Sequence, residues 1–302
     1  MIRIDEHISV LDFAGFQYPH CNCLWIDDDI KCLIDTNPGT ADLDYLRTQA
    51  VDLIIHTHGH IDHYLYNQYF PNSKILMHKA DHAAAQSADG CLDEFGIKLF
   101  YDDPRIHQQF LDGILYRVSR IDGEIEDNQV IKLGSTTIET LHLPGHSPGH
   151  CGFLFPEQGF IFTGDIDLSK FGPWYANMGC SLAELFRSID RLLSMKPDYL
   201  ITGHGEAIVK KDVSRRLRAY RDIVYARQGR IVDLIYSGHH SLEEIARSLP
   251  VYVKLPQPKS IFYLYEKIMI MIHLRYLQEM GHVVQENDRY YLREGARPSN
   301  IS

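Results

Sequence analysis

Residues 57–63 read THGHIDH, which places three histidines and an aspartate within seven positions. Each imidazole ring carries two polar nitrogens that need hydrogen-bond partners once they are buried. Several such rings in one short segment raise the cost of burial, because every unpartnered polar group loses its hydration. A bound cation would supply the missing partner. The segment is therefore a candidate metal site, and its candidate ligands are His58, His60, Asp62 and His63.

Three further residues of ligand type follow apolar runs elsewhere in the chain. The run VDLIIHT ends just before His58, and TIETLHL, GFIFTG and DYLITG are followed within a few residues by His146, Asp165 and His204. These runs are short and bounded by Gly, Pro, Asn or Asp, which is typical of strands. Loops at one edge of a sheet in an α/β fold lie together and commonly hold the active site. We therefore expect all seven side chains to converge.

The seven candidates offer imidazole nitrogen and carboxylate oxygen but no thiolate. This donor set favours Zn²⁺, with Fe and Mn as alternatives. Seven ligands exceed the needs of one tetrahedral ion, but they suit two ions about 3.5–4 Å apart that share a carboxylate and a hydroxide. Two divalent metal ions are thus the expected cofactor.

The motifs HGHIDH, PGHSPGH, FTGD and GHG occur in this order over residues 58–204. Together they resemble the metallo-β-lactamase superfamily, and the resemblance covers the N-terminal two thirds of the chain. It implies an αββα sandwich with the metals at one edge of the β-layers. It also implies that one metal is held by His58, His60 and His146 and the other by Asp62, His63 and His204, with Asp165 as the bridge.

The resemblance further implies hydrolysis. Two cations lower the pKa of a bridging water toward neutrality and polarise the group under attack, so no side-chain nucleophile is required. Asp62 is the candidate catalytic residue, which would orient the hydroxide or relay a proton to the leaving group. Histidine at position 60 matches the hydrolytic members, since the diiron flavoprotein branch uses glutamate there.

The segment FGPWYANMGC, residues 171–180, is rich in aromatic and turn residues. In the layout of the superfamily it would rim the metal cleft, so Trp174, Tyr175 and Asn177 are candidates for substrate contact. Simple packing beneath a loop is the alternative. Among the other histidines, we expect His150 to support the ligands from behind rather than to bind metal.

The order of predicted elements divides the chain in two. Strands mixed with helical stretches up to residue 212 predict layered α/β packing, and we assign residues 1–212 to a metallo-β-lactamase-like catalytic domain. Residues 89–124 show no regular spacing of apolar residues, and we interpret them as an insertion that is partly helical. Long helical patterns and a final hairpin follow. We assign residues 213–302 to a mostly helical, winged-helix-like domain.

Charge is divided unevenly between these two parts. The net charge is −10, with 16 Lys and Arg against 31 Asp and Glu in residues 1–212, and 14 against 9 in residues 213–302. A basic tail that docks on an acidic body is the favoured explanation, and contact with nucleic acid is the alternative.

Composition indicates a globular protein, since 45% of the residues are hydrophobic and 23% are charged. No signal-like run and no apolar stretch of about 20 residues is evident, so we expect a cytoplasmic protein with no membrane association. The six cysteines are scattered, which argues against disulfides. The apolar belt at residues 261–280 indicates burial or a homodimer.

These observations favour a dinuclear metal-dependent hydrolase that attacks an ester, thioester or lactone bond of a small molecule. Only 38 residues separate Asp165 from His204, which is too short for the large insert of the β-CASP nucleases. An endoribonuclease or phosphodiesterase is the second hypothesis. An iron-dependent sulfur dioxygenase is the third, although those proteins use one metal and would not need His63 and His204.

Overall fold

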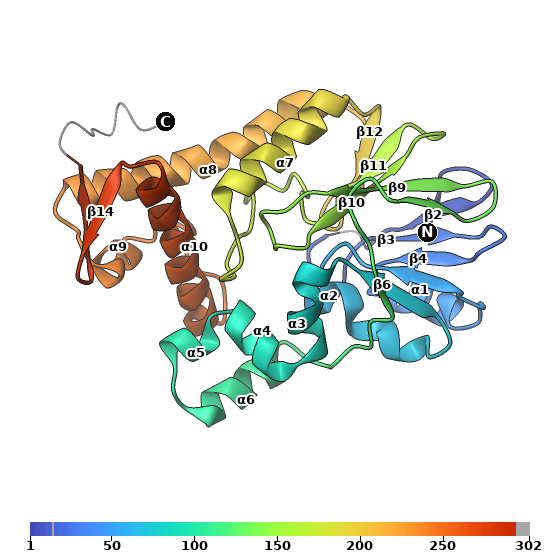
Figure 1. Ribbon diagram of the computed structural model, residues 1–302, viewed down its shortest axis with the longest axis horizontal. Helices are drawn as coiled ribbons and strands as arrows, with labels where there is room; N and C mark the ends of the chain where they lie inside the picture. Colours follow the sequence, from blue (N-terminus) through green and yellow to red (C-terminus); the bar gives the residue numbers. More distant parts are fainter. Residues whose placement is uncertain (14, 294–302) are drawn as a thin grey trace.

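The computed structural model describes residues 1–13 and 15–293, and two mixed β-sheets form the part of it that lies at the right of Figure 1. Within the described residues the first sheet has seven strands in sequence order. Strands β1 to β4 are antiparallel, and the strands from β4 to β7 are parallel. The strands are β1 (Ile2–Arg3), β2 (Ile8–Leu11), β3 (Cys23–Ile26), β4 (Cys32–Ile34), β5 (Leu53–Ile55), β6 (Lys74–Met77) and β7 (Gly123–Glu124).

The second sheet contains six of the described strands. Its neighbours are antiparallel except for β11 and β12, which are parallel. In spatial order the strands are β13 (Ile208–Val209), β12 (Tyr199–Ile201), β11 (Phe160–Phe162), β10 (Cys151–Phe155), β9 (Thr137–His142) and β8 (Val130–Lys132).

The two sheets pack face to face because each presents a row of apolar side chains to the other. On β3, Leu24 faces the second sheet and shares a buried cluster with Phe153 and Phe162. The next residue, Trp25, belongs to a different buried cluster on the outer side. This alternation follows from the two-residue period of a strand, and it gives the first sheet two apolar faces to bury.

Helices cover the outer faces of both sheets (Figure 1). Helix α1 (Thr40–Leu46) packs Leu43 into the cluster of Trp25. Helix α7 (Leu182–Met195) packs Ile189 into a cluster with residues of the second sheet. The layers are therefore α, β, β and α, as the resemblance implies.

The connections that precede and follow β6 are largely helical. Residues 89–124, predicted as a partly helical insertion, contain most of α4 and all of α5 and α6. The elements of these connections are α2 (Ile61–Tyr64), η1 (Leu65–Tyr69), η2 (Lys79–Asp81), α3 (His82–Gln86), α4 (Ala88–Glu94), α5 (Ile97–Phe100) and α6 (Pro104–Gly113).

The described residues of the C-terminal region form three helices and a hairpin, as predicted. Its elements are α8 (Val213–Tyr236), α9 (Leu242–Arg247), α10 (Lys259–Glu279), β14 (Val283–Glu286) and β15 (Arg289–Leu292). The winged-helix assignment stays a prediction, and residues 294–302 of the predicted domain lie outside the described residues. None of the helices in the described part of the chain is long and apolar enough to cross a membrane.

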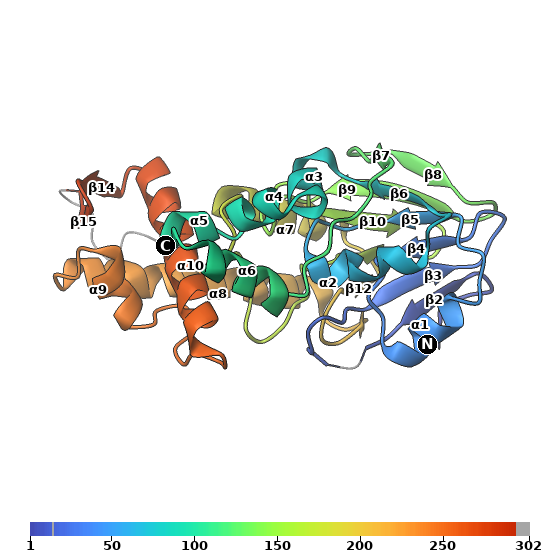
Figure 2. The ribbon, with the colours of Figure 1, turned by 90° about the horizontal axis from the view of Figure 1, so that it is seen from below.

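Helix α10 lies against the rest of the chain (Figure 2). Its residues Leu264 and Ile268 are buried in the cluster that also contains Ile189 of α7. The Lys267 ammonium group lies 5.3 Å from the ring centre of Phe100 in α5. The apolar belt of α10 is therefore buried within this chain, and one core extends across the predicted boundary at residue 212.

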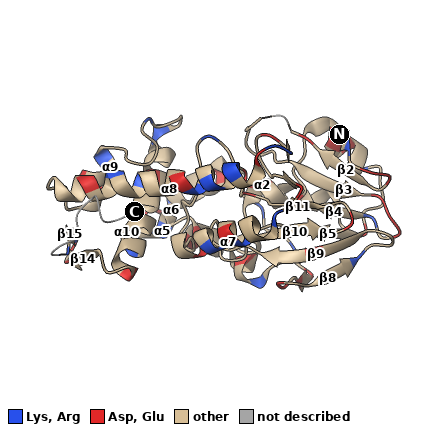
Figure 3. Cartoon of the chain, turned by 90° about the horizontal axis from the view of Figure 1, so that it is seen from above, with Lys and Arg blue, Asp and Glu red and all other residues tan. Residues whose placement is uncertain are grey.

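Basic residues gather at the beginning of α8 (Figure 3). Arg216 forms an ion pair with Glu206 at 2.7 Å, and Arg221 forms one with Asp190 at 2.7 Å. Both acidic partners precede residue 212. These contacts match the favoured explanation of a basic tail on an acidic body.

Candidate metal centre

The seven candidate ligands lie on loops at one edge of the two sheets. His58 and His60 follow β5, and the same loop leads into α2, which contains Asp62 and His63. The remaining three candidates follow β9, β11 and β12, and they are His146, Asp165 and His204.

Their donor atoms form two compact groups. One atom from each of four residues lies within 4.8 Å of all the others in the group of His58, His60, His146 and Asp165. The same is true of Asp62, His63 and His204. Asp165 connects the groups, because its Oδ2 lies 3.3 Å from His146 Nε2 and its Oδ1 lies 3.1 Å from His63 Nε2. The structure thus brings all seven candidates together.

Three buried atoms of this cluster have no hydrogen-bond partner among the described residues: His63 Nε2, His204 Nε2 and Asp165 Oδ1. Unpartnered buried polar atoms are uncommon in folded proteins and call for an explanation. The two imidazole nitrogens lie 3.1 Å and 3.5 Å from the carboxylate oxygen. A divalent cation among them would satisfy all three, and imidazole with carboxylate is a donor set that such ions bind. The residues therefore fit a metal site.

Hydrogen bonds behind the ligands prepare the rings for metal binding. His63 Nδ1 donates to Asp35 Oδ2 at 2.8 Å, and His146 Nδ1 donates to the carbonyl oxygen of Trp174 at 2.9 Å. A ring whose Nδ1 carries the proton has its Nε2 lone pair free, and in both residues Nε2 faces the cluster. Such partners usually orient the histidine ligands of a metal.

Asp81 connects two of the ligand loops from behind. Its carboxylate accepts hydrogen bonds from the N–H groups of Gly59 at 3.0 Å and Gly149 at 2.6 Å, and from the Ser147 hydroxyl at 2.6 Å. The approach requires glycine, because a Cβ atom at position 59 or 149 would lie 2.8 or 2.7 Å from atoms of Asp81. The loops of residues 58–63 and 146–150 are thereby held together.

Burial and neighbouring charges shift the pKa values of the donor groups in the cluster in different directions. Burial holds the pKa of His58 well below its usual value, so this ring is neutral. Burial alone would raise the pKa of Asp165, but the neighbouring His204 and His63 rings hold it well below its usual range. Burial also opposes protonation of His63, yet the carboxylates of Asp165 and Asp35 help raise its pKa above the usual value. A cation that binds must displace that proton.

The three candidates for substrate contact lie in different environments. Trp174 is partly exposed, and its ring centre lies 5.6 Å from that of His60. The Tyr175 side chain is fully buried, with its hydroxyl oxygen 2.8 Å from His273 Nε2. Asn177 is also fully buried, and its amide nitrogen lies 3.2 Å from His60 Nε2. In this conformation only Trp174 of the three offers surface that a substrate could touch.

His150 supports the cluster without joining it, as the sequence predicts. Its Nδ1 donates to the Leu143 carbonyl oxygen at 3.0 Å, and its Nε2 accepts from the Asp165 N–H at 3.1 Å. Both ring nitrogens are therefore engaged.

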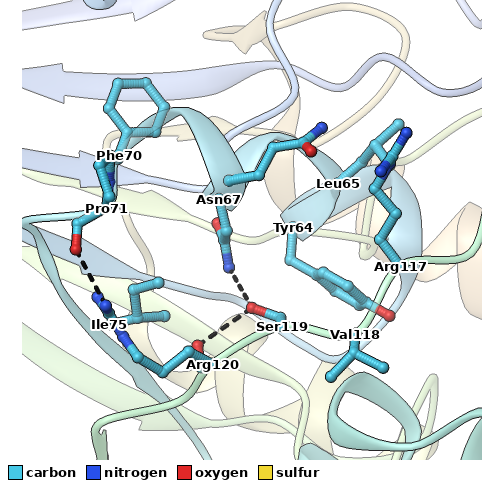
Figure 4. Close-up of a pocket in the computed structure, with 11 residues that line it drawn as sticks. Tyr64, Leu65, Asn67, Phe70, Pro71, Ile75, Arg117, Val118, Ser119 and Arg120 are labelled. Carbon is cyan, nitrogen blue, oxygen red and sulfur yellow. Dashed lines mark hydrogen bonds between the residues drawn. The ribbon is translucent and has the colours of Figure 1, made fainter.

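A hollow of about 440 Å³ is lined by residues of α2, of η1 and of the segment 117–120 (Figure 4). None of the seven candidate ligands lines it. Asn67 in its wall donates to Ser119 Oγ at 2.8 Å, and its Oδ1 lies 3.0 Å from His56 Nε2. This polar part of the wall is thus already engaged in hydrogen bonds within the protein.

Sequence reasoning missed several residues around the cluster. Asp35 follows β4 directly, so the rule that found the ligands at strand ends could also have found it. Thr57 Oγ1 donates to Asp35 at 2.8 Å and lies 3.0 Å from His58 Nδ1. Phe16 has a side chain that is 73% exposed and a ring centre 4.8 Å from that of His204. No sequence signal indicated Phe16.

The fold and the site define an αββα protein with a His and Asp metal-binding cluster at the edge of its sheets. Residues 19–204 match the family model described as the metallo-beta-lactamase superfamily. This span includes every candidate ligand and more than half of the chain. The chain therefore belongs to the metallo-beta-lactamase superfamily.

Curated relatives of known name are similar over part of the chain. It is 29% identical to the hydroxyacylglutathione hydrolase GloC of Haemophilus influenzae over 170 residues, which are 53% of this chain and 71% of that protein. It is 26% identical to a hydroxyacylglutathione hydrolase of Fuscovulum blasticum over 168 residues, 52% of this chain and 62% of the relative. An atrochrysone carboxyl ACP thioesterase of Aspergillus fumigatus is 31% identical over 111 residues, 34% of each chain. The names of these relatives describe hydrolases. This agrees with the assignment of the chain as a metal-dependent hydrolase.

Solved structures resemble nearly the whole chain. A metallo-beta-lactamase family protein from Thermus thermophilus aligns with a TM-score of 0.69 and 21% identity, covering 96% of this chain and 100% of that one. A beta-lactamase domain protein from Burkholderia ambifaria aligns with a TM-score of 0.73 and 19% identity, covering 96% and 94%. At these identities the likeness establishes the fold, including the helical C-terminal region.

Proposed function

We propose that this protein is a dinuclear metal-dependent hydrolase that cleaves a thioester, or a related ester or lactone, of a small molecule. The observation that carries the proposal is the pair of donor groups joined by the Asp165 carboxylate. In this assignment one ion is held by His58, His60 and His146 and the other by Asp62, His63 and His204, with Asp165 shared. Zinc is the favoured metal.

The chemistry of the site follows from its charges. When bound, two divalent ions would make hydroxide available from water near neutral pH and would polarise the acyl oxygen. Asp35 keeps the Nε2 lone pair of His63 directed at the cluster. The Asp62 carboxylate is 17% exposed, and its Oδ2 lies 3.5 Å from His204 Nε2. It is therefore placed to carry a proton between the site and the leaving group.

A thioester suits this site better than an ester or an amide. A thiol has a pKa of about 8.5, so a thiolate leaves with less help from a general acid than an alkoxide or an amine needs. Hydroxyacylglutathione hydrolase and ACP thioesterase, the names of the relatives, both describe hydrolysis of a thioester.

The distribution of charge supports a small substrate over RNA. Residues 1–212 carry 31 acidic against 16 basic side chains, which would repel a polyanion. Arg216 and Arg221, at the basic start of α8, are already paired with acidic partners. An endoribonuclease is the second candidate, and a steep loss of activity with added salt would favour it.

A single-metal sulfur dioxygenase is less compatible with the site. It would leave the second donor group, including the unpartnered Nε2 atoms of His63 and His204, without a role.

The test is a panel of substrates on protein whose metal content has been measured. The panel contains S-lactoylglutathione, an acyl ester of p-nitrophenol, a lactone and bis-p-nitrophenyl phosphate. We expect the thioester to be hydrolysed with the highest kcat/KM. Activity on the phosphodiester alone would overturn the proposal in favour of the second candidate.

A further inference from the structure

The loop of residues 171–177 contacts two candidate metal ligands on its inner side. The carbonyl oxygen of Trp174 accepts the hydrogen bond from His146 Nδ1 at 2.9 Å. The Asn177 amide nitrogen donates to the His146 carbonyl oxygen at 2.8 Å and lies 3.2 Å from His60 Nε2. The orientation of the His146 ring therefore depends on where the backbone of this loop lies.

On its outer side the loop is held by Arg227 of α8. Arg227 Nη1 donates to the Pro173 carbonyl oxygen at 2.6 Å and to the Tyr175 hydroxyl at 3.2 Å. Its Nη2 donates to the Phe171 carbonyl oxygen. The centre of the guanidinium group also lies 4.3 Å from the centre of the Phe171 ring. One side chain thus contacts residues on both sides of Trp174.

Arg227 is a buried cation, since only 1% of the residue is exposed. Among the described residues no carboxylate lies within ion-pair distance of it, and the nearby Glu266 carboxylate accepts from the N–H groups of Val251 and Tyr252 instead. Burying an unpaired charge is costly unless hydrogen bonds compensate for the lost hydration. Here the compensation comes from the 171–177 loop, so the charge and the position of that loop depend on each other.

The C-terminal region also holds the side chain of Trp174. Its indole Nε1 donates to the Tyr252 hydroxyl at 3.2 Å. The Tyr175 hydroxyl lies 2.8 Å from His273 Nε2 in α10. Contacts from α8, α10 and the segment between α9 and α10 thus converge on the loop that touches His146.

We propose that Arg227 is a positioning residue for the metal site, which acts by holding the Trp174 carbonyl oxygen against His146 Nδ1. The proposal rests on the ligand role of His146 in the proposed function. It makes the C-terminal helices a part of the metal site, because the planar guanidinium fork can hold two carbonyl oxygens at once.

The test compares metal binding by the full-length protein and its Arg227→Met variant. Zinc affinity is measured by competition with a chromogenic chelator, and the visible absorption spectrum is recorded with Co²⁺ in place of zinc. We expect roughly a tenfold loss of affinity, since partners behind a ligand typically contribute tenfold or more. We also expect a changed Co²⁺ spectrum. Arg227→Lys keeps the charge but lacks the planar fork of the guanidinium group. Its affinity for zinc should therefore lie between those of the parent protein and Arg227→Met.

Arg230→Met is the matched control. Arg230 lies one turn further along α8, and its Nε donates to the Pro250 carbonyl oxygen at 2.6 Å rather than to a carbonyl oxygen of the 171–177 loop. We expect parental affinity and spectrum for this variant. The proposal is overturned if folded Arg227→Met matches the parent, or if Arg230→Met loses as much affinity.

A second variant keeps the proposal testable if Arg227→Met does not fold. Arg227→Lys keeps the buried charge, but it lacks the planar fork that holds the Pro173 and Phe171 carbonyl oxygens together. A changed Co²⁺ spectrum supports the proposal, and an unchanged one overturns it. Neither the zinc affinity nor the Co²⁺ spectrum is measured with a substrate. If the protein did not hydrolyse thioesters, both measurements would still test the role of Arg227.

Discussion

Asp165 Oδ1 lies 3.1 Å from His63 Nε2, and neither atom has a hydrogen-bond partner in the described part of the chain. The other oxygen of the same carboxylate lies 3.3 Å from His146 Nε2. One side chain therefore faces both donor groups, which is the position a bridging ligand requires. The predictions below begin with this relationship.

The proposed site should bind two divalent ions per chain. Elemental analysis of protein purified without added chelator should give a ratio near two, with zinc predominant. Removal of the metal should abolish hydrolysis and lower the unfolding temperature, because ligands that bind only the folded state stabilise it. At a free metal concentration 100 times Kd this stabilisation is about 2.7 kcal/mol. A ratio of one iron per chain would contradict the assignment.

Asp165→Asn should disrupt both donor groups together. The amide lacks the charge that compensates two cations and offers one good donor oxygen instead of two. We expect the bound metal to fall to one ion or fewer per chain, and kcat/KM for a thioester to fall by at least about 100-fold. Asp190→Asn removes a surface carboxylate paired with Arg221 and is the control. It should retain both the metal content and the kcat/KM of the parent protein. Full metal content in Asp165→Asn would refute the bridging role.

Trp174→Ala should raise KM more than it lowers kcat, because it weakens substrate binding more than the catalytic step. The ring lies beside His60, while the contact with His146 is made by the backbone carbonyl, which the substitution keeps. We expect KM for the thioester to rise roughly tenfold, which corresponds to about 1.4 kcal/mol. Trp174→Phe keeps an aromatic surface and should lie between the parent and the alanine variant. Steady-state kinetics that show an unchanged KM for Trp174→Ala would exclude a role in substrate contact.

Glu94 should make the fold less stable as the pH rises. Burial, with a smaller contribution from Asp81, raises the pKa of Glu94 to about 8 from the ordinary value of 4.5. Between these values the folded state keeps a proton that the unfolded state has released, so the free energy of unfolding falls with increasing pH and levels off above pH 8. Glu94→Gln is neutral in both states and lacks this dependence.

The measurement is urea unfolding of the parent and Glu94→Gln at several values between about pH 5 and pH 9. The advantage of the variant should grow across this range by about 1 kcal/mol or more. Glu157→Gln, at an exposed position, serves as the control and should follow the parent. Parallel curves for the parent and Glu94→Gln would show that this carboxyl group does not contribute.

The ligand-bearing loops could be predicted because their signals are local. Each candidate ligand lies within a few residues of a short apolar strand, and the sequence around it carries the donor atoms themselves. Strands mixed with helical stretches predict layered α/β packing, and these patterns depend on neighbours in the chain, so one sequence is enough to predict them. The order of the layers, α, β, β and α, was implied by the resemblance to the superfamily.

The supporting contacts could not be predicted, because they join residues that are distant in the chain. Asp81 bonds to Ser147, 66 positions away, and Arg227 bonds to Pro173, 54 positions away. Composition likewise left two explanations for the apolar belt of α10, which packing within the chain now accounts for.

The sequence by itself determined which donor atoms are present and on which loops they lie. The residue types give the donor atoms, and the spacing of the predicted strands gives the loops. Only the tertiary structure decided which atoms face one another, which tautomer each ring is held in and which distant side chains hold the loops in place. The physical reason is that a hydrogen bond depends on distances of a few tenths of an ångström. Those distances are set by the packing of the whole chain.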